Sequence, residues 1–372
     1  MRPPPGLEPV VLNNETVRSI VRISAGGQRI RLRLSNEFGA KPLTIGAVSV
    51  SLADADGKVV ANTTRTVKFG GKTSAVVPQG APMYSDPIDL PVKALATLSI
   101  SVFFPEDAGT CTCHTMGLQQ GYVSAPGDFT AADFQPARTI SARPFISGVD
   151  VEVKKGGAIV ALGDSITDGA GSTAGANRRW PDRLAERLAK DRPRESWGVV
   201  NAGMSGNRVL QDGIGPSALA RFDRDVLAQS GVAYVIVFEG INDLGLGFGR
   251  LPPGFPGGQS AQKPTADTLI NGYRQLIARA HARGVKVIGA TIAPYEGANY
   301  YSDEGEAQRQ AVNKWIRTGG EFDGVADIDA ALRDPASPLK IADGKHAGDH
   351  LHGSDAGYEA AANAIDLKLF KN

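Results

Sequence analysis

The sequence has little of several features that mark specialised classes of protein. It contains two cysteines in 372 residues, and no apolar run reaches the roughly 18 residues that a membrane-spanning helix needs. The 40 Lys and Arg residues nearly balance the 39 Asp and Glu residues, which leaves a net charge of +1. Electrostatics therefore give no reason to expect a nucleic-acid partner. No block of like charges indicates a disordered tail.

The two cysteines, Cys111 and Cys113, are separated by one residue and followed by His114. A disulfide between them would close a very small ring, and disulfide geometry is demanding. We therefore expect two free thiols. A local disulfide and a metal site that includes His114 are the alternatives, and the pair does not indicate a redox compartment.

The first residues, Met1 to Gly6, lack the charged and apolar regions of a signal peptide. We expect either a cytoplasmic protein or a secreted one whose leader is absent from this sequence. The oligomeric state cannot be predicted from these features.

A length of 372 residues and 42% hydrophobic content suit two domains with substantial cores. Residues 1–150 contain short alternating segments that are separated by turn signals such as Gly26-Gly27 and Gly70-Gly71, which predicts a β-sandwich accessory domain, jelly-roll-like in type. Its basic positions from Arg29 to Arg33 should line a solvated face. The expected strands are Thr16–Ser24, Arg29–Leu34, Ala47–Ala53, Arg65–Phe69, Ser74–Val77 and Ala96–Phe104.

Residues 151–372 alternate strand and helix patterns, which predicts an α/β domain with a doubly wound parallel sheet. The expected strands are Ala158–Leu162, Val199–Ala202, Ala233–Glu239, Val285–Ile292 and Val325–Ile328. The expected helices are Pro181–Lys190, Ser217–Gln229, Thr265–Arg283, Glu304–Thr318 and Ser354–Leu369, the last with Ser354 as its N-cap. Between them, Gly245 to Pro264 is rich in glycine and proline, and we expect a long loop that shapes substrate choice.

Four polar segments should meet at one edge of this sheet. Three of them follow strands: Gly163-Asp164-Ser165, Asn201 to Asn207, and Glu239 to Asp243. The fourth, Asp349 to His352, precedes the last helix. In an open α/β sheet, loops at the carboxyl ends of the strands form the ligand-binding crevice. The sequence therefore predicts a site at this edge.

These segments contain the residue types that acyl transfer needs. A serine hydroxyl is a weak nucleophile until a base accepts its proton, and a histidine base needs a carboxylate to fix its tautomer. Asp349 and His352 are three residues apart, so a tight turn can bring the carboxylate to one ring nitrogen. Gly206 lacks a Cβ and allows close backbone approach to a substrate, and Asn242 offers a side-chain N–H.

The four segments resemble the conserved blocks of the SGNH hydrolases, also called GDSL esterases and lipases. The matching residues are Gly163-Asp164-Ser165, Gly206, Gly240-Ile241-Asn242-Asp243 and Asp349-His350-Leu351-His352, in the family's order. The resemblance implies a flavodoxin-like sheet, Ser165 as nucleophile, His352 as base and Asp349 as its orienting acid. It implies an oxyanion hole made by the N–H groups of Ser165 and Gly206 and the side chain of Asn242. Bacterial members with a β-sandwich before this domain are a further resemblance.

The resulting expectation is a serine esterase that forms an acyl-serine intermediate and needs no cofactor or metal. Short-chain or acetyl esters are the expected substrates, either small molecules or polysaccharides such as acetylated sugars. The alternatives are a lipase for longer acyl esters, a carbohydrate-binding protein with a degenerate hydrolase domain, and a metal-dependent hydrolase that uses His346, His350 and His352. Thr167 replaces the last glycine of a Gly-x-Ser-x-Gly elbow, which argues against an α/β-hydrolase fold.

Overall fold

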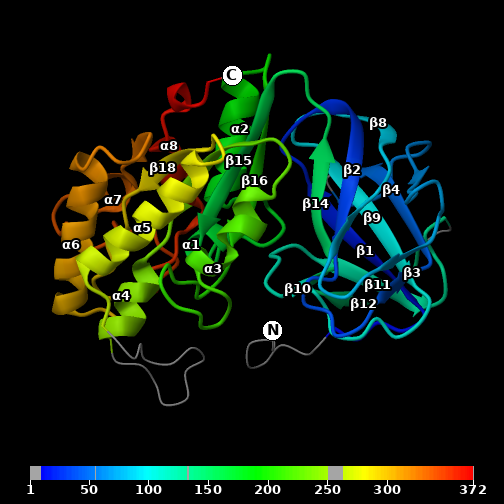
Figure 1. Cartoon of the computed structure of the whole chain (residues 1–372), viewed down its shortest axis with the longest axis horizontal. Helices are drawn as coiled ribbons and strands as arrows, with labels where there is room; N and C mark the ends of the chain where they lie inside the picture. The colour runs from blue at the N-terminus through cyan, green and yellow to red at the C-terminus, as the bar shows by residue number, and fades with distance from the viewer. Residues whose placement is uncertain (1–9, 55, 132–133, 250–262, 372) are drawn as a thin grey trace. The chain divides into compact units, whose positions relative to one another are not determined.

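The computed structural model divides the chain into two compact units, Met1–Lys154 and Lys155–Asn372 (Figure 1). It describes residues 10–54, 56–131, 134–249 and 263–371. Each unit has a hydrophobic cluster of its own. We refer to them as the N-terminal unit and the C-terminal unit.

The N-terminal unit is built from antiparallel strands. Its larger sheet has the order β12-β11-β1-β9-β4-β5, and a second sheet has the order β14-β2-β7, with β8 also paired to β2. One hydrophobic cluster takes side chains from both sheets, as in the predicted sandwich. The strands of the larger sheet are β1 (Glu15–Arg22), β4 (Ala47–Ala53), β5 (Arg65–Thr66), β9 (Thr97–Phe104), β11 (Gly121–Pro126) and β12 (Pro136–Ile140); those of the second are β2 (Gly27–Ser35), β7 (Pro82–Tyr84), β8 (Ile88–Val92) and β14 (Ile146–Val151). Two short pairs complete the unit: β3 (Leu43–Ile45) with β6 (Ala75–Val77), and β10 (Cys113–His114) with β13 (Arg143–Pro144).

The basic residues of β2 differ from the solvated face that the sequence predicts. Arg29 is about half exposed, but Arg33 is only 7% exposed. Strand β14 pairs antiparallel with β2 and brings Glu152 to 2.7 Å from Arg29 and Asp150 to 2.6 Å from Arg31. The expectation is wrong for Arg33 because the neighbouring strand β14 covers this part of β2. The alternation of residue types in a sequence does not show which strands will pair.

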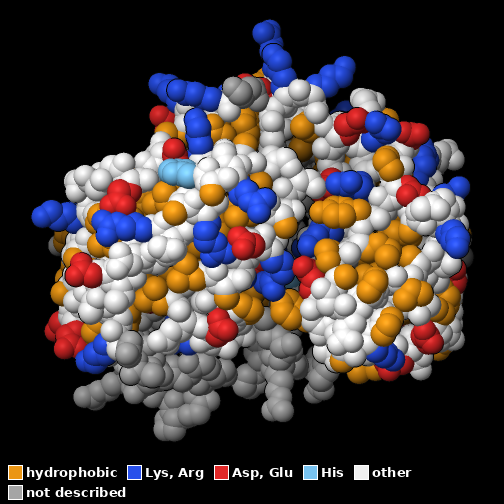
Figure 2. Space-filling model, viewed as in Figure 1, with side chains coloured by type: hydrophobic (Ala, Val, Ile, Leu, Met, Phe, Trp, Pro, Cys, Tyr) orange, Lys and Arg blue, Asp and Glu red, His pale blue; other side chains and the backbone are white. Residues whose placement is uncertain are grey.

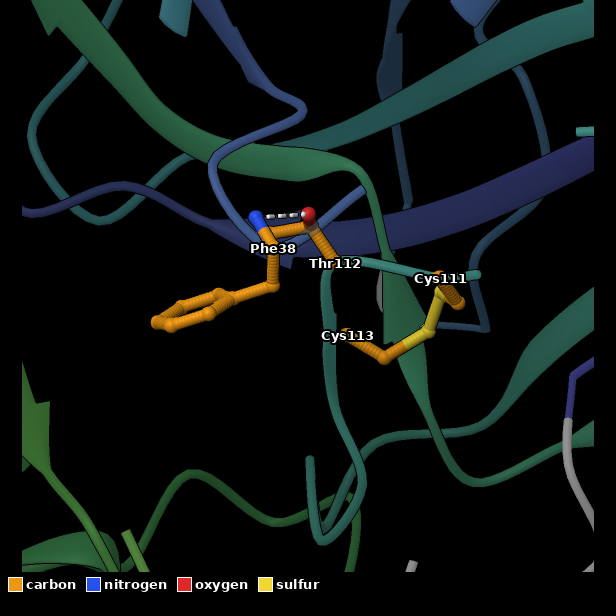
Figure 3. Close-up of a disulfide and its surroundings, with 4 residues drawn as sticks. All are labelled: Phe38, Cys111, Thr112 and Cys113. Carbon is orange, nitrogen blue, oxygen red and sulfur yellow. Dashed lines mark hydrogen bonds between the residues drawn. A yellow bond between two sulfur atoms is a disulfide. The ribbon is translucent and has the colours of Figure 1, made fainter. Parts of the chain in front are cut away.

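The two cysteines form a disulfide, so the expectation of free thiols is wrong (Figure 3). The Cα atoms of Cys111 and Cys113 are 5.3 Å apart, within the range that disulfides span. The residue between them is held on both sides, because Phe38 N donates to Thr112 Oγ1 at 3.0 Å and Phe145 N donates to Thr112 O at 2.8 Å. These contacts fix the turn that brings the two sulfurs together.

The C-terminal unit contains a parallel sheet of order β16-β15-β17-β18-β19. This is the flavodoxin-like order, in which the second strand lies outside the first and the chain then reverses direction across the sheet. The predicted fold class is therefore confirmed. The strands are β15 (Gly156–Gly163), β16 (Ser196–Gly203), β17 (Val232–Phe238), β18 (Lys286–Ala290) and β19 (Gly324–Ala326).

The helices of this unit pack in two groups. Helix α8 contacts both α2 and α7, and α3, α4, α5 and α6 form the other set of contacts. Because crossovers between parallel strands are right-handed, reversing direction after β16 puts α3 to α6, which lie in the crossovers from β16 to β19, on the face opposite to α2. The helices are α1 (Ser165–Asp168), α2 (Trp180–Asp191), α3 (Ala218–Phe222), α4 (Ile241–Phe248), α5 (Ala266–His281), α6 (Asp303–Thr318), α7 (Ile328–Leu332) and α8 (Asp355–Asn363).

Two sequence expectations about helix boundaries have different outcomes. Ser354 is the N-cap of α8, as predicted, and its hydroxyl accepts from Gly357 N at 3.2 Å. The expected loop from Gly245 is wrong at its start, because Gly245 and Gly247 lie within α4. Packing against neighbouring residues overrides the low helix propensity of glycine. Most of the remaining loop, residues 250–262, lies outside the described residues.

Charges of both signs are interspersed over the face of each unit in Figure 2. This matches the near balance of basic and acidic residues in the sequence. Among the described residues, no helix combines the length and the apolar composition that crossing a membrane requires.

Candidate active site

Ser165 lies where the first parallel strand of the C-terminal unit ends. Strand β15 stops at Gly163, and Asp164 caps the short helix α1, with its Oδ1 accepting from Ile166 N at 2.9 Å. Ser165 is the first residue of α1 and is 9% exposed. The hydroxyl is therefore held by a rigid strand end and a capped turn.

Asp349 and His352 are brought together by a tight turn. Asp349 Oδ1 accepts from the backbone N–H groups of Leu351 at 3.0 Å and His352 at 2.9 Å. Its other oxygen, Oδ2, lies 2.6 Å from His352 Nδ1. His350 adopts a left-handed conformation with φ of 58°, which lets the chain fold back within three residues. The predicted turn between the carboxylate and the ring nitrogen is present.

The same imidazole reaches the serine. His352 Nε2 lies 2.8 Å from Ser165 Oγ, across a sequence separation of 187 residues. In the neutral tautomer that carries its proton on Nδ1, the ring donates to Asp349 and accepts from the serine hydroxyl. Burial tends to raise the pKa of Asp349, but hydrogen bonds from the side chain and backbone of His352 outweigh it and hold that pKa below its ordinary value. The carboxylate is thus available to stabilise an imidazolium.

The loop after α1 supports the position of His352. A Cβ atom on Gly171 would lie 2.8 Å from the Cβ of Ala347 and 3.4 Å from that of His352, so only glycine fits this approach. Asp355, in the first turn of α8, accepts from Thr173 N at 2.9 Å and from Thr173 Oγ1 at 2.8 Å. The serine and histidine segments are therefore fastened to each other away from the reacting atoms.

Gly206 and Asn242 lie on the two neighbouring strand-end segments. Gly206 has φ of 75°, a conformation that L side chains rarely adopt. The Asn242 amide is 5% exposed, and its Nδ2 donates to Asn207 O at 3.0 Å. Tyr300 Oη donates to Asn242 Oδ1 at 3.3 Å. With one N–H and the carbonyl of the amide occupied, the second N–H of Nδ2 has a fixed direction.

Sequence reasoning missed the two residues that orient Asn242. Asn207 directly follows Gly206, in one of the four segments expected at this edge of the sheet. Its place near the site was therefore predictable, but its hydrogen bond with Asn242 was not. Tyr300 lies in an irregular segment after β18, and nothing in the sequence pattern links it to Asn242. Burial raises the pKa of Tyr300 well above its ordinary value, so its hydroxyl remains a donor.

The other two histidines of the C-terminal segment pack against each other. The rings of His346 and His350 are 4.3 Å apart, and His346 Nδ1 accepts from Gly348 N at 3.0 Å. Their neighbour His352 is engaged with Ser165 and Asp349. Over the described part of the chain, no three His, Cys, Asp or Glu side chains are grouped as metal ligands would be.

Three buried carboxyl groups lie behind the site. Burial raises the pKa of Asp164 to about 7 and that of Asp243 to about 6, in each case against hydrogen bonds from backbone N–H groups. Burial, with the nearby charge of Asp164, also raises the pKa of Glu239 well above its ordinary value. Asp164 Oδ2 and both Glu239 oxygens have no hydrogen-bond partner among the described residues. These groups bind protons more tightly in the folded chain than in the unfolded one.

This arrangement predicts a pH dependence of stability that Asp164→Asn should reduce. Protonated Asp164 contributes fully to stability at pH values below its unfolded-state pKa, which is near 4. That contribution is lost as the pH rises through the folded-state pKa of about 7. The difference between the folded-state and unfolded-state pKa of Asp164 corresponds to at most about 4 kcal/mol of unfolding free energy. Asparagine keeps the N-cap but does not titrate. We expect the Tm of the wild type to fall more than that of Asp164→Asn between pH 5 and pH 8, by several degrees in thermal scans. Equal falls in both proteins would contradict this expectation.

Comparison with known proteins locates the sequence signature in the C-terminal unit. The sequence model of the GDSL-like lipase/acylhydrolase family matches residues 161–360, more than half of the 372 residues. Similar solved structures include an acetylxylan esterase from Geobacillus stearothermophilus, with 23% identity, a TM-score of 0.43 and coverage of 59% of this chain and 96% of that one. An alpha/beta hydrolase enzyme from the metagenome of Lake Arreo, Spain, has 24% identity, a TM-score of 0.43 and coverage of 56% and 93%. A search of curated protein sequences found no significant match.

Proposed function

The chain belongs to the GDSL-like lipase/acylhydrolase family and is an ester hydrolase, and from this premise we propose that it cleaves short-chain carboxylic esters through an acyl-serine intermediate on Ser165. The observation that carries the proposal is the hydrogen-bonded series from Ser165 Oγ through His352 to Asp349, with contacts of 2.8 Å and 2.6 Å. This series contains a nucleophile, a base within reach of its proton, and a carboxylate that orients the base.

The proposed reaction proceeds in two halves. Ser165 Oγ attacks the ester carbonyl while His352 Nε2 accepts its proton, and the resulting imidazolium is stabilised by Asp349. The imidazolium then protonates the leaving alcohol as the carbon–oxygen bond breaks, which leaves an acyl-serine. In the second half, His352 takes a proton from water, the hydroxide attacks the acyl carbon, and Ser165 leaves with a proton returned from the imidazolium. The products are a carboxylic acid and an alcohol, and no cofactor takes part.

The proposed oxyanion hole consists of the N–H groups of Ser165 and Gly206 and the second N–H of Asn242 Nδ2. What supports it is the fixed direction of the Asn242 amide, whose other polar positions are occupied by Asn207 and Tyr300. Preorganised donors of this kind stabilise the negative charge that develops on the carbonyl oxygen. One such donor contributes on the order of 3 kcal/mol in comparable enzymes.

Short acyl groups, acetyl foremost, are the proposed substrates. The sequence contains no long apolar segment of the kind that would cover a lipase site. For the alcohol side we propose acetylated sugars, with the N-terminal unit as an accessory domain for a polysaccharide. A β-sandwich beside a hydrolase domain is compatible with that role.

A substrate panel tests this proposal. The full chain should hydrolyse p-nitrophenyl acetate and butyrate with kcat/KM at least tenfold above that for the palmitate ester, and it should release acetate from acetylated sugars. Activity should be unchanged after treatment with a chelator, because no step uses a metal. Preference for palmitate would favour a lipase, loss of activity with chelator would favour the metal-dependent alternative, and no hydrolysis of any ester would favour a binding protein.

A further inference from the structure

Arg221 is a buried cation that the proposed reaction does not use. It lies in α3, which is capped by Ser217 and continues as a π-helical turn over Asp223–Leu227. Its side chain is 1% exposed, and it shares the buried face of this segment with Phe222 and Val226. A buried charge is costly unless it is paired and hydrogen-bonded. The contacts of this guanidinium therefore have to account for its burial.

The guanidinium contacts the carboxyl ends of three adjacent strands. Its Nη2 donates to Gly163 O at 2.9 Å, at the end of β15, and its Nη1 donates to Ala202 O at 2.7 Å, near the end of β16. The carboxylate of Glu239, which directly follows β17, lies 3.7 Å from Nη2. These three strands carry the segments of Ser165, Gly206 and Asn242. One side chain thus spans the strand ends from which the proposed nucleophile and the proposed oxyanion donors extend.

The Nη1 group also donates to Asp225 Oδ2 at 3.2 Å, within the same helical segment. The Nε donor connects Arg221 to the proposed oxyanion hole. Its Nε donates to Asn207 Oδ1 at 2.8 Å. The backbone carbonyl of the same Asn207 accepts from Asn242 Nδ2 at 3.0 Å. Asn207 also follows Gly206 directly, so its position determines where the Gly206 segment lies. A displacement of Asn207 would therefore move both Gly206 and Asn242.

We propose that Arg221 is a positioning residue, which sets the distances between Ser165, the Gly206 N–H and the Asn242 amide by holding Gly163, Ala202 and Asn207 in one rigid fork. The inference rests on the proposed function, because it assigns these donors to the oxyanion. It goes beyond that function by identifying the side chain that holds the oxyanion donors at fixed distances from Ser165. Its hydrogen bonds go to Gly163, Ala202, Asn207 and Asp225 rather than to Ser165.

The geometry explains why this position needs arginine. A guanidinium is planar and presents five N–H donors in a fixed arrangement, whereas a lysine ammonium is a single point on a flexible stem. Lysine at position 221 would retain the positive charge near Glu239 but could not bond Gly163, Ala202 and Asn207 together. Arg221→Lys therefore separates the effect of geometry from that of charge.

The experiment compares Arg221→Lys with a matched control, Arg309→Lys, in the full chain. Arg309 is also fully buried in the C-terminal unit, donates to Ile292 O at 2.8 Å and pairs with Asp329 at 2.7 Å. Both variants should lower the Tm. Arg221→Lys should lower kcat on p-nitrophenyl acetate about 100-fold, with KM changed less than threefold, because small displacements of reacting groups have effects of this size. The Ki of a boronic acid that mimics the tetrahedral intermediate should rise by the same factor. Arg309→Lys should change kcat and this Ki less than threefold.

The outcomes separate this inference from the proposed function. If wild-type protein does not hydrolyse esters through Ser165, the proposed function itself fails. If wild type is active but kcat and Ki of Arg221→Lys match those of Arg309→Lys, or if the loss is in KM alone, the positioning role is wrong. Should Arg221→Lys fail to fold, Asn207→Ala decides, because it removes the side chain that joins Arg221 to the oxyanion segment. A parallel tenfold change of kcat and Ki supports the role, and unchanged values overturn it.

Discussion

Replacing Ser165 with alanine should reduce kcat for p-nitrophenyl acetate by about 10⁴-fold or more, because the variant has no hydroxyl to form the acyl intermediate. A fluorophosphonate should add once to the wild-type protein, at Ser165, and should not label Ser165→Ala. Mass spectrometry of the labelled protein locates the adduct, and initial rates give the loss of activity. The residual rate reports what the remaining oxyanion donors and substrate binding achieve without the nucleophile.

Ser337→Ala is a suitable control for this experiment. Ser337 lies in a turn in which its backbone N–H donates to Asp334 O at 3.3 Å, away from the contacts that hold Ser165. Its alanine variant should be labelled and active as the wild type is. An adduct on another residue, or full turnover by Ser165→Ala, would show that Ser165 is not the nucleophile.

His352→Ala should lose kcat to a similar extent, whereas His350→Ala should lose less than about tenfold. The reason is geometric: His352 Nε2 reaches Ser165 Oγ at 2.8 Å, while His350 stacks on His346 with ring centroids 4.3 Å apart. Without the imidazole at position 352, no base accepts the serine proton. Steady-state rates of the two variants, each checked for folding by its Tm, make the comparison.

The pair His350 and His352 is informative because both histidines lie in the same four-residue segment. Both variants remove an imidazole from the same loop, but only one of the two imidazoles contacts Ser165. If His350→Ala were the more damaging change, the base would have to be reassigned to His350. Equal losses would indicate that the loop as a whole, rather than one imidazole, is required.

The parallel sheet was predictable because its strands are strongly apolar and alternate with amphipathic helices. The flavodoxin-like order came from the family resemblance and is confirmed by the pairing of β15 with both β16 and β17. The short helix α1 and the glycine-containing helix α4 could not be read, because neither has a long apolar period. Several short strands of the N-terminal unit, such as β7 and β13, are two or three residues long and too short to show alternation.

In the candidate site, the residues on the strand-end segments and in the Asp349–His352 turn were readable, whereas the residues that position them from elsewhere in the fold were not. Asp349 and His352 are three positions apart, so their turn could be predicted. Arg221 resembles an ordinary basic residue of a surface helix. One signal in the sequence points to its burial. Arg221 lies next to Phe222, which shares an apolar helical face with Ala218 and Val226 at intervals of four residues, and that face packs on the core. Apart from the nearby Asp225, the partners of its guanidinium come from the ends of distant strands and the loop at Asn207, and no local pattern encodes them.

The contact between Ser165 and His352 also has a consequence for biosynthesis. It joins residues 187 positions apart, near the two ends of the C-terminal unit. During translation the nucleophile therefore emerges long before its base, and a nascent chain that stops short of Asp349 carries an unactivated serine. Such distant contacts form late, once the intervening chain has been ordered. Hydrolytic activity should consequently arise only after Asp349 and His352 have been synthesised and have folded against the Ser165 segment.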